Sequence, residues 1–323
     1  SKDSADVQYF YNNIDSLALG RLHKLNMSLK EFQLYSPLYQ RDPFYATLGN
    51  IGLASMRLDH TPRMRSEFSF GIHTFDPYRY TNENTEYYRV NDPYTELYYV
   101  MGSKKEQMLK MKFHRRIIGH FSIGFSARFI NSPGFYPRQQ SDNKTLVIYG
   151  QWYTGNRRYG VLVNYIHNKI YVEENGGIED DSYFENNLES NREIFPVNLN
   201  NAENQTKDNN LFINQYFHLS KPRKQRSGVN LGRLTYSFQQ FRQTQMYLDG
   251  EPASGFYDNI YLDSTNTLDS VNYYKIENQL TWSNLEYDDT LLHRPLYFYF
   301  GARHRYIELA GYMPTTIFRQ WTA

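Results

Sequence analysis

The sequence lacks cysteine, lacks a long apolar run and lacks a surplus of either charge. Without cysteine there can be no disulfide bond, thiol catalysis or thiolate metal site. No segment of the printed sequence has the roughly 18 consecutive apolar residues that a transmembrane helix needs. The 35 basic and 34 acidic residues leave a formal net charge of +1, which does not favour a nucleic acid partner.

Aromatic residues are abundant although the chain as a whole is polar. The 323 residues include 31 tyrosines and 21 phenylalanines, while hydrophobic residues make up 40% and mean hydropathy is −0.73. Soluble all-β proteins can be rich in tyrosine, but a membrane barrel combines aromatic girdles with a polar lumen and long polar loops. The composition therefore favours a membrane β-barrel.

Residues 118–178 carry the clearest secondary-structure signal, an alternation of apolar and polar side chains. In a β-strand, successive side chains point to opposite faces. One face would carry Phe121, Ile123, Phe125, Ala127 and Phe129, then Tyr159, Val161, Val163 and Tyr165, and the other His120, Ser122, Gly124, Ser126 and Arg128. Val147, Tyr149 and Leu162 interrupt the polar face. The pattern predicts a two-faced sheet, either the wall of a membrane barrel or a soluble β-sandwich with a packed core.

Similar patterns predict further strands, and the connections between them alternate in length. The expected strands are 64–74, 97–101, 109–114, 211–220, 229–240, 273–283 and 296–305. The short connections are 115–117, 154–157, 221–228 and 286–294, the long ones are 131–143, 173–210 and 241–272, and the turn at 102–105 is an exception. Short turns at one end and long loops at the other predict a bacterial outer-membrane barrel, with the turns periplasmic and the loops extracellular.

The expected architecture is an all-β, antiparallel up-and-down transmembrane β-barrel that is incomplete in this chain. About nine or ten strands can be drawn, whereas a closed barrel in lipid needs an even number and a closing pair. Residues 313–323 look like a strand just beginning, and the chain starts without Met or an apolar leader, so we expect a processed or partial chain. Residues 1–60, with Pro37 and Pro43 among aromatic residues, are expected to form an irregular plug-like or periplasmic segment, and residues 61–323 the barrel.

Several short blocks resemble the large "putative porins" of Bacteroidota-type outer membranes. They are 32–38 (FQLYSPL), 48–52 (LGNIG), 93–99 (PYTELYY), 105–107 (KEQ), 132–136 (SPGFY) with Arg138 and Gln139, 156–159 (NRRY) and 174–178 (ENGGI). The blocks keep their order over about half of the chain. The resemblance implies an outer-membrane location and a full-length protein of more than 323 residues.

Three sets of candidate residues follow from the two faces and the irregular segment. The lumen-lining candidates are Lys110, Lys112, His114, His120, Ser122, Ser126, Arg128, Arg233, Gln239, Arg303 and Arg305. The lipid-facing candidates are Phe121, Ile123, Phe125, Phe129, Tyr159, Val161, Val163, Tyr165, Phe298 and Phe300. The plug candidates are Phe32, Tyr35, Leu48, Gly49 and Asn50. The basic lumen residues would either favour anions or pair with Glu67, Glu96 or Glu277 and fill the barrel.

The sequence indicates neither an enzyme nor a metal or cofactor site, because its histidines are scattered and it has no HExxH or Gly-x-Ser-x-Gly motif. Two functions stay open: a porin for passive diffusion of small solutes, or a non-conducting barrel subunit of a larger outer-membrane assembly, secretion or surface-display complex. The expected partners are outer-membrane lipid and lipopolysaccharide, joined in the second case by other outer-membrane or periplasmic proteins, with no nucleic acid. A soluble β-sandwich binding module is the remaining alternative.

Overall fold

The structure is a computed structural model that describes residues 7–14, 22–25, 33–39, 44–59, 73–219, 231–253, 255–258, 267–284, 298–311 and 315–322. Strands dominate these residues, and the only α-helix among them is the short α1 (Ser182–Glu185). The expected all-β fold is therefore confirmed. The strand expected at 64–74 lies outside the described residues except for 73–74, which are not in a strand.

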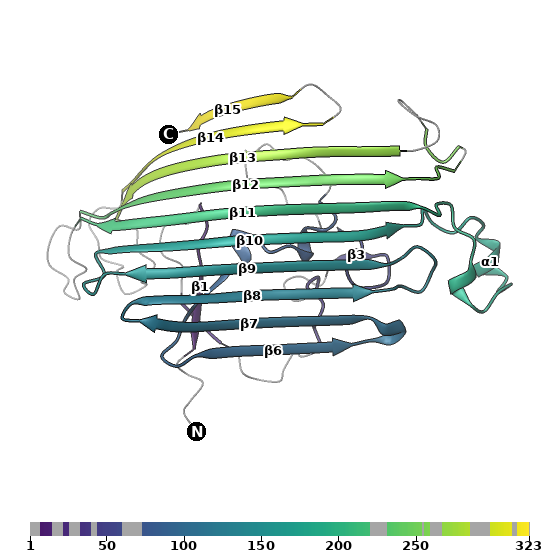
Figure 1. The fold of residues 1–323 in the computed structure, drawn as a ribbon, viewed down its shortest axis with the longest axis horizontal. Coiled ribbons are helices and arrows are strands. Elements are labelled where there is room, and N and C mark those ends of the chain that lie inside the picture. Colours follow the sequence, from purple (N-terminus) through teal and green to yellow (C-terminus); the bar gives the residue numbers. More distant parts are fainter. Residues whose placement is uncertain are drawn as a thin grey trace.

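Ten strands of the described residues form one antiparallel sheet, the body of the molecule, and each strand pairs with the next along the chain (Figure 1). The strands are β6 (Tyr94–Met101), β7 (Gln107–Ile118), β8 (Phe121–Ser132), β9 (Ser141–Tyr153), β10 (Tyr159–Glu174), β11 (Ala202–His218), β12 (Arg233–Asp249), β13 (Thr267–Ser283), β14 (Tyr299–Ala310) and β15 (Thr316–Thr322). β6 and β15 form the two edges of this sheet, which is open. The arrangement is that of an incomplete barrel, as the sequence predicted.

The later strands are longer than their hydrophobic pattern indicated. β11 begins at Ala202 instead of 211, and β12 continues to Asp249 instead of 240. In the extension of β11 the buried positions carry Asn204, Thr206 and Asp208, so the apolar half of the alternation is missing. These residues pair in register with β12, and the ladder is held by backbone hydrogen bonds that hydropathy cannot reveal.

The connections fall at two ends of the sheet, the turn-side end (left in Figure 1) and the loop-side end (right). The turn-side connections are 119–120, 154–158, 219–232 and 284–298, and the loop-side connections are 102–106, 133–140, 175–201, 250–266 and 311–315. The sorting by length is weaker than predicted, because 219–232 and 284–298 exceed the expected turns and 311–315 is short. The first turn lies at 119–120 instead of 115–117, because Arg115 and Arg116 continue β7.

The two faces of the sheet have different side chains and different surroundings. On β8, Phe121, Ile123 and Phe125 are exposed, whereas the alternating Ser122 and Ser126 are buried. Alternation along each strand therefore sorts the apolar residues to one face and most polar residues to the other. We call the covered face the inner face and the opposite one the outer face.

The inner face is covered by the N-terminal segment, defined as the described residues between 7 and 90, which lies behind the sheet in Figure 1. Three of its strands, β1 (Gln8–Tyr11), β2 (His23–Lys24) and β5 (Glu86–Arg89), form a small sheet. It also contains a hairpin of β3 (Tyr45–Thr47) and β4 (Ser55–Arg57), and the 3-10 helices η2 (Asp76–Tyr78) and η3 (Asn82–Asn84). The further 3-10 helices η4 (Ser103–Lys105) and η5 (Arg192–Ile194) lie in loop-side connections.

Two hydrophobic clusters join the N-terminal segment to the sheet. In the first, Leu38, Ile51, Leu53, Phe75 and Tyr78 of the segment pack with Met108, Ile130, Ile170 and Val172 of the sheet. In the second, Phe10, Tyr87, Tyr88 and Val90 pack with Val147, Tyr149, Leu162 and Ile166. Burial of one large apolar side chain contributes about 1.5–3 kcal/mol. The segment is therefore an integral part of the folded core.

Candidate functional site

Most of the predicted lumen residues lie on the inner face. Lys112, His114, Ser122, Ser126, Arg128, Arg233, Gln239 and Arg305 are buried, and Lys110 and Arg303 are half-buried. His120 lies instead in the turn between β7 and β8, where it is exposed and its ring centroid lies 4.7 Å from that of Tyr153. His120 is therefore at the turn-side end and not on the inner face. The role of the other residues in lining a lumen stays a prediction.

The predicted lipid-facing residues lie on the outer face or beside it. Phe121, Ile123, Phe125, Phe129, Val163, Tyr165 and Phe300 are exposed, and Tyr159, Val161 and Phe298 are half-buried. Phe298 precedes β14, and its ring centroid lies 5.0 Å from that of Trp282. Contact of these residues with lipid also stays a prediction.

The predicted plug residues differ in their surroundings. Tyr35 packs against the first hydrophobic cluster, and Asn50 is buried. The side chain of Leu48 is exposed, but its carbonyl oxygen accepts a hydrogen bond from Gln139 Nε2 at 2.9 Å. Gly49 is exposed, and Phe32 lies outside the described residues. The structure thus places residues 48–50 at a contact between the N-terminal segment and the sheet.

The first group of polar contacts lies at the loop-side end. Asn50 Nδ2 donates to Ser132 Oγ at 3.0 Å and to the carbonyl oxygen of Gln139 at 3.1 Å. Glu106 Oε2 accepts from the backbone N–H of Ile51 and from Ser132 Oγ, both at 3.0 Å. Three of the blocks that carry the family resemblance, those containing Asn50, Glu106 and Ser132, therefore meet at one place.

Side chains of the sheet also bind backbone carbonyls of the N-terminal segment. Ser141 Oγ donates to the carbonyl oxygen of Ile51 at 2.6 Å, and Asn143 Nδ2 donates to that of Gly52 at 3.2 Å. Gly52 has a φ of +94°, and a Cβ added there would lie 2.6 Å from Ser141 Oγ. Only glycine permits so close an approach in this backbone conformation.

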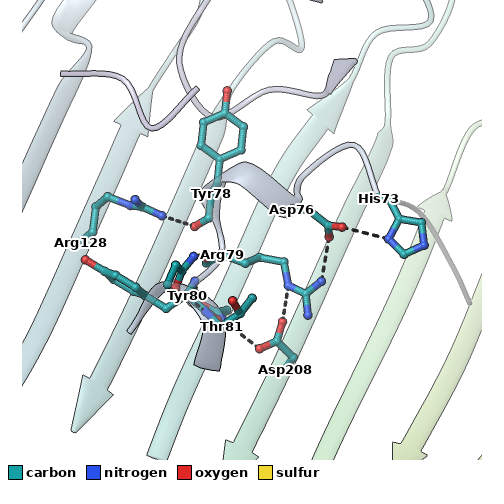
Figure 2. Close-up of polar contacts among 10 residues, drawn as sticks. His73, Asp76, Tyr78, Arg79, Tyr80, Thr81, Arg128 and Asp208 are labelled. Carbon is teal, nitrogen blue, oxygen red and sulfur yellow. Dashed lines mark hydrogen bonds and ion pairs between the residues drawn. The ribbon is translucent and has the colours of Figure 1, made fainter. Parts of the chain in front are cut away.

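Arg79 links the N-terminal segment to β11 through a buried ion pair (Figure 2). Its Nε donates to Asp208 Oδ2 at 2.7 Å, and its Nη1 donates to Asp76 Oδ1 at 2.9 Å. Asp208 is 1% exposed, and its other oxygen accepts from Asn168 Nδ2 at 2.6 Å. Asn168 also binds the backbone N–H and carbonyl of Tyr80, at 2.9 and 2.8 Å. Neighbouring residues of β10 and β11 thus hold one stretch of the segment by charge and by hydrogen bonds.

A further arginine contacts the same stretch from β8. Figure 2 shows the Arg128 guanidinium directed at the carbonyl of Tyr78, to which it donates a hydrogen bond. The guanidinium also lies 5.0 Å from the ring centroid of Tyr80. The charge of Arg128 therefore interacts with a backbone carbonyl dipole and with an aromatic ring of the N-terminal segment.

Lys112 of β7 forms the contact with β5. Its ammonium binds the carboxylate of Glu86 and the hydroxyl of Tyr88, the latter at 2.9 Å. Burial by itself raises the pKa of Glu86, but the charge of Lys112 and hydrogen bonds from Lys112 and Tyr88 outweigh it, so this pKa lies below its ordinary value. Glu86 is therefore a carboxylate at neutral pH.

Acid should weaken the contact between β5 and the sheet. Because the pKa of Glu86 is lowered in the folded state, its contribution is fully present above the ordinary value of about 4.3 and is lost as the pH falls through the lowered value. We expect faster hydrogen exchange of residues 86–90 at about pH 3 than at about pH 7, after correction for intrinsic rates. Glu86→Gln should raise the exchange at neutral pH and remove most of the difference; a variant with the full pH dependence would contradict this assignment.

A second carboxylate, that of Glu277 on β13, forms ion pairs with three basic side chains on the inner face. Its Oε1 lies 2.7 Å from Arg305 Nε and 3.5 Å from Arg303 Nε, and its Oε2 lies 3.1 Å from Lys275 Nζ. Glu277 is 0% exposed. This one buried carboxylate therefore offsets part of the positive charge that Lys275, Arg303 and Arg305 bring to the region.

The same pairing occurs on β6 and β7, where the Glu96 carboxylate lies 3.3 Å from Lys110 Nζ and 3.7 Å from Lys112 Nζ. The sequence left open whether the basic residues favour anions or pair with carboxylates, and the structure shows pairing with Glu96 and Glu277. Glu67, the third expected partner, lies outside the described residues. Paired cations exert a weaker net field on a passing anion. The geometry gives little support to a preference for anions.

A polar cavity of about 670 Å³ lies between the N-terminal segment and the sheet. Its charged lining includes Lys110, Lys112 and Arg128 from the sheet and Asp59, Asp76 and Glu86 from the segment. The volume falls within the range of roughly 300–1,000 Å³ that is typical of small-molecule pockets. Within the described ranges, no group of three or more His, Asp or Glu side chains could hold a metal ion.

Four residues with central contacts were not among the candidates expected from the sequence: Arg79, Asn164, Asn168 and Asp208. Asn164 Nδ2 binds Asn82 Oδ1 at 3.0 Å and the Tyr87 hydroxyl at 2.6 Å. A signal was present on β10, where Asn164 and Asn168 alternate with apolar residues on the inner face. Buried amides need hydrogen-bond partners, so their spacing indicated that something covers this face.

These features define a class of protein. Each strand of the sheet pairs with the next, the apolar face is exposed and the polar face is turned inward. A meander of this kind is the wall of an outer-membrane type β-barrel. A family model described as "Putative porin" matches residues 8–310, and the chain belongs to this family. A comparison with curated proteins finds no match.

Family and fold together fit an outer-membrane location. Among the described residues, no helix has both the length and the apolar character needed to cross a membrane. Membership of a family of porins also favours a barrel protein over an enzyme.

Proposed function

We propose that this protein is an outer-membrane β-barrel in which the outer face contacts lipid and the N-terminal segment acts as a plug over the inner face. The observation that carries the proposal is the asymmetry of the sheet. Its apolar face is open, whereas its polar face is buried under the protein's own chain through hydrogen bonds, ion pairs and two hydrophobic clusters. In a membrane barrel the apolar face meets lipid and the polar face lines the lumen.

The orientation in the membrane belongs to the same proposal. The turn-side end would face the periplasm and the loop-side end the outside, as in bacterial barrels with short periplasmic turns. The connections at 119–120 and 154–158 support this orientation, and so does the long connection at 175–201.

Transport would consist of passive diffusion of small solutes past the plug. The cavity of about 670 Å³ between plug and wall is the space that a solute would use. Because Lys110 and Lys112 in its lining are paired with carboxylates, the passage should discriminate only weakly between cations and anions. Small polar solutes without large net charge fit this lining best.

Conductance of the full-length protein in planar lipid bilayers tests the proposal. We expect small or infrequent openings, because the plug occupies the inner face, and an anion-to-cation permeability ratio of about 1. A wide, steadily open pore would contradict the plug, and a protein that stays soluble and folded without detergent would contradict the barrel.

A non-conducting barrel that serves a larger complex is the second candidate. The two hydrophobic clusters favour it, because a plug with its own apolar packing is costly to displace. Absence of conductance even after the plug has been released, together with a stable partner that co-purifies from the membrane, would favour this function over diffusion.

A further inference from the structure

An apolar hollow of about 620 Å³ interrupts the outer face over β8, β9 and β10. Its floor is Gly150, which pairs with Ile123 on one side and Val163 on the other. The larger side chains of Phe121 and Trp152 stand at its turn-side edge. The volume is within the range of roughly 300–1,000 Å³ found for small-ligand pockets.

The backbone does not require a glycine at position 150. A Cβ added there would have Phe121 Cε2 and the carbonyl oxygen of Ser122 as its nearest neighbours, both at 3.9 Å, which is ordinary van der Waals contact. Glycine also weakens a strand interior relative to residues with side chains. The glycine therefore leaves a space on an otherwise continuous apolar surface.

Arg115 lies next to this hollow on the same face. It pairs with Ile123 across β7 and β8, so its side chain points to the outer face, where it is exposed. Within the described part of the chain, its guanidinium has neither an ion-pair nor a hydrogen-bond partner. An arginine on a lipid-facing surface extends its apolar stem along that surface and places its charge at the headgroups.

Aromatic residues at the same end mark where headgroups would lie. The ring centroids of Trp152 and Tyr159 are 5.9 Å apart, and Trp152 is 40% exposed on the outer face. Tryptophan and tyrosine are enriched where a membrane meets water. The hollow thus begins at an aromatic interface, with an unpaired cation beside it.

We propose that the hollow binds one acyl chain of a glycerophospholipid whose phosphate is held by Arg115. The inference rests on the proposed function, which places the outer face in the membrane and the turn-side end toward the periplasm. The arginine supplies the charge complementary to a phosphate, and the apolar floor at Gly150 supplies a seat for a hydrocarbon chain.

The test measures phospholipid that stays with the full-length protein after extraction in mild detergent and gel filtration. Quantitative mass spectrometry should find about one phospholipid per chain in the wild type. Gly150→Leu, which fills the hollow, and Arg115→Gln, which removes the charge, should each lower this amount at least several-fold. Arg115→Lys should keep much of it, because the cation is retained.

Ala302→Leu is the matched control. Ala302 is an exposed residue of the outer face on β14, away from the hollow, so a leucine side chain there should leave the bound lipid unchanged. The heat-dependent shift on gel electrophoresis checks that each variant is folded. Arg115→Gln keeps the test decisive if Gly150→Leu fails to fold.

Three results would overturn the inference. One is a folded Gly150→Leu or Arg115→Gln variant with the wild-type amount of phospholipid. Another is that the wild-type protein retains lipopolysaccharide in place of phospholipid. The third is a wild-type dimer that the Gly150→Leu substitution dissociates without loss of lipid, because the hollow would then be occupied by a second copy of the chain. A detergent-extracted, folded membrane protein with unchanged lipid rejects only this inference, whereas a protein soluble without detergent rejects the proposed function itself.

Discussion

Asp208→Asn is expected to release the N-terminal segment from β11. The substitution keeps the shape of the side chain but removes the charge that Arg79 meets at 2.7 Å, and Asp76, its remaining carboxylate partner, is 46% exposed. Removal of one partner of a buried ion pair typically costs about 3–5 kcal/mol. Limited proteolysis should therefore cut residues 73–90 much faster in the variant, and bilayer recordings should show larger or more frequent openings.

Asp269→Asn is the control for this experiment. It makes the same chemical change at an exposed position of β13, so proteolysis and conductance should match the wild type. Equal protection of residues 73–90 in Asp208→Asn and the wild type would show that the hydrophobic clusters alone hold the segment. Faster cleavage without any change in conductance would instead support the non-conducting function.

Glu277→Gln is expected to destabilise the sheet at β13 and β14. The neutral amide would leave Lys275, Arg303 and Arg305 together without their shared carboxylate, at a position that is 0% exposed. The cost of such uncompensated buried charge is about 3–5 kcal/mol. Urea unfolding of the full-length protein in lipid vesicles should show a lower midpoint with an unchanged slope.

Glu251→Gln provides the comparison, because Glu251 is exposed in the connection after β12. Its unfolding midpoint should equal that of the wild type. If the unfolding midpoint of Glu277→Gln also stays at the wild-type value, the three cations are solvated in the lumen. The ion-pair network would then not contribute to the stability of the sheet.

The faces of the sheet could be predicted from the sequence because a strand has a period of two residues. Phe121 and Ser122 sort to opposite faces by geometry alone, without knowledge of what lies on either side. The strand ends could not be predicted in the same way. Asn204 and Thr206 belong to a polar stretch of β11 that pairs through its backbone, and its composition resembles that of a loop.

The contacts of the N-terminal segment were beyond sequence reasoning because they join distant residues. Arg79 and Asp208 are separated by 129 positions, and nothing local to either residue indicates the other. The nearest signal in the sequence was the set of residues that break the alternation of apolar and polar side chains. Tyr149 and Leu162 interrupt a polar face because they pack against the segment, so an irregularity in the pattern marked a contact surface.

The sheet repeatedly holds the N-terminal segment by its carbonyl groups, including those of Ile51, Gly52, Tyr78 and Tyr80. Every residue type has a carbonyl, so these anchors depend on where the backbone runs and little on which side chains it carries. Side chains that face the cavity could change during evolution without loosening the segment, whereas an inserted or deleted residue would shift the following carbonyls away from their donors. Such a framework would tolerate a change in the chemistry of the interior without a change in the path of the backbone.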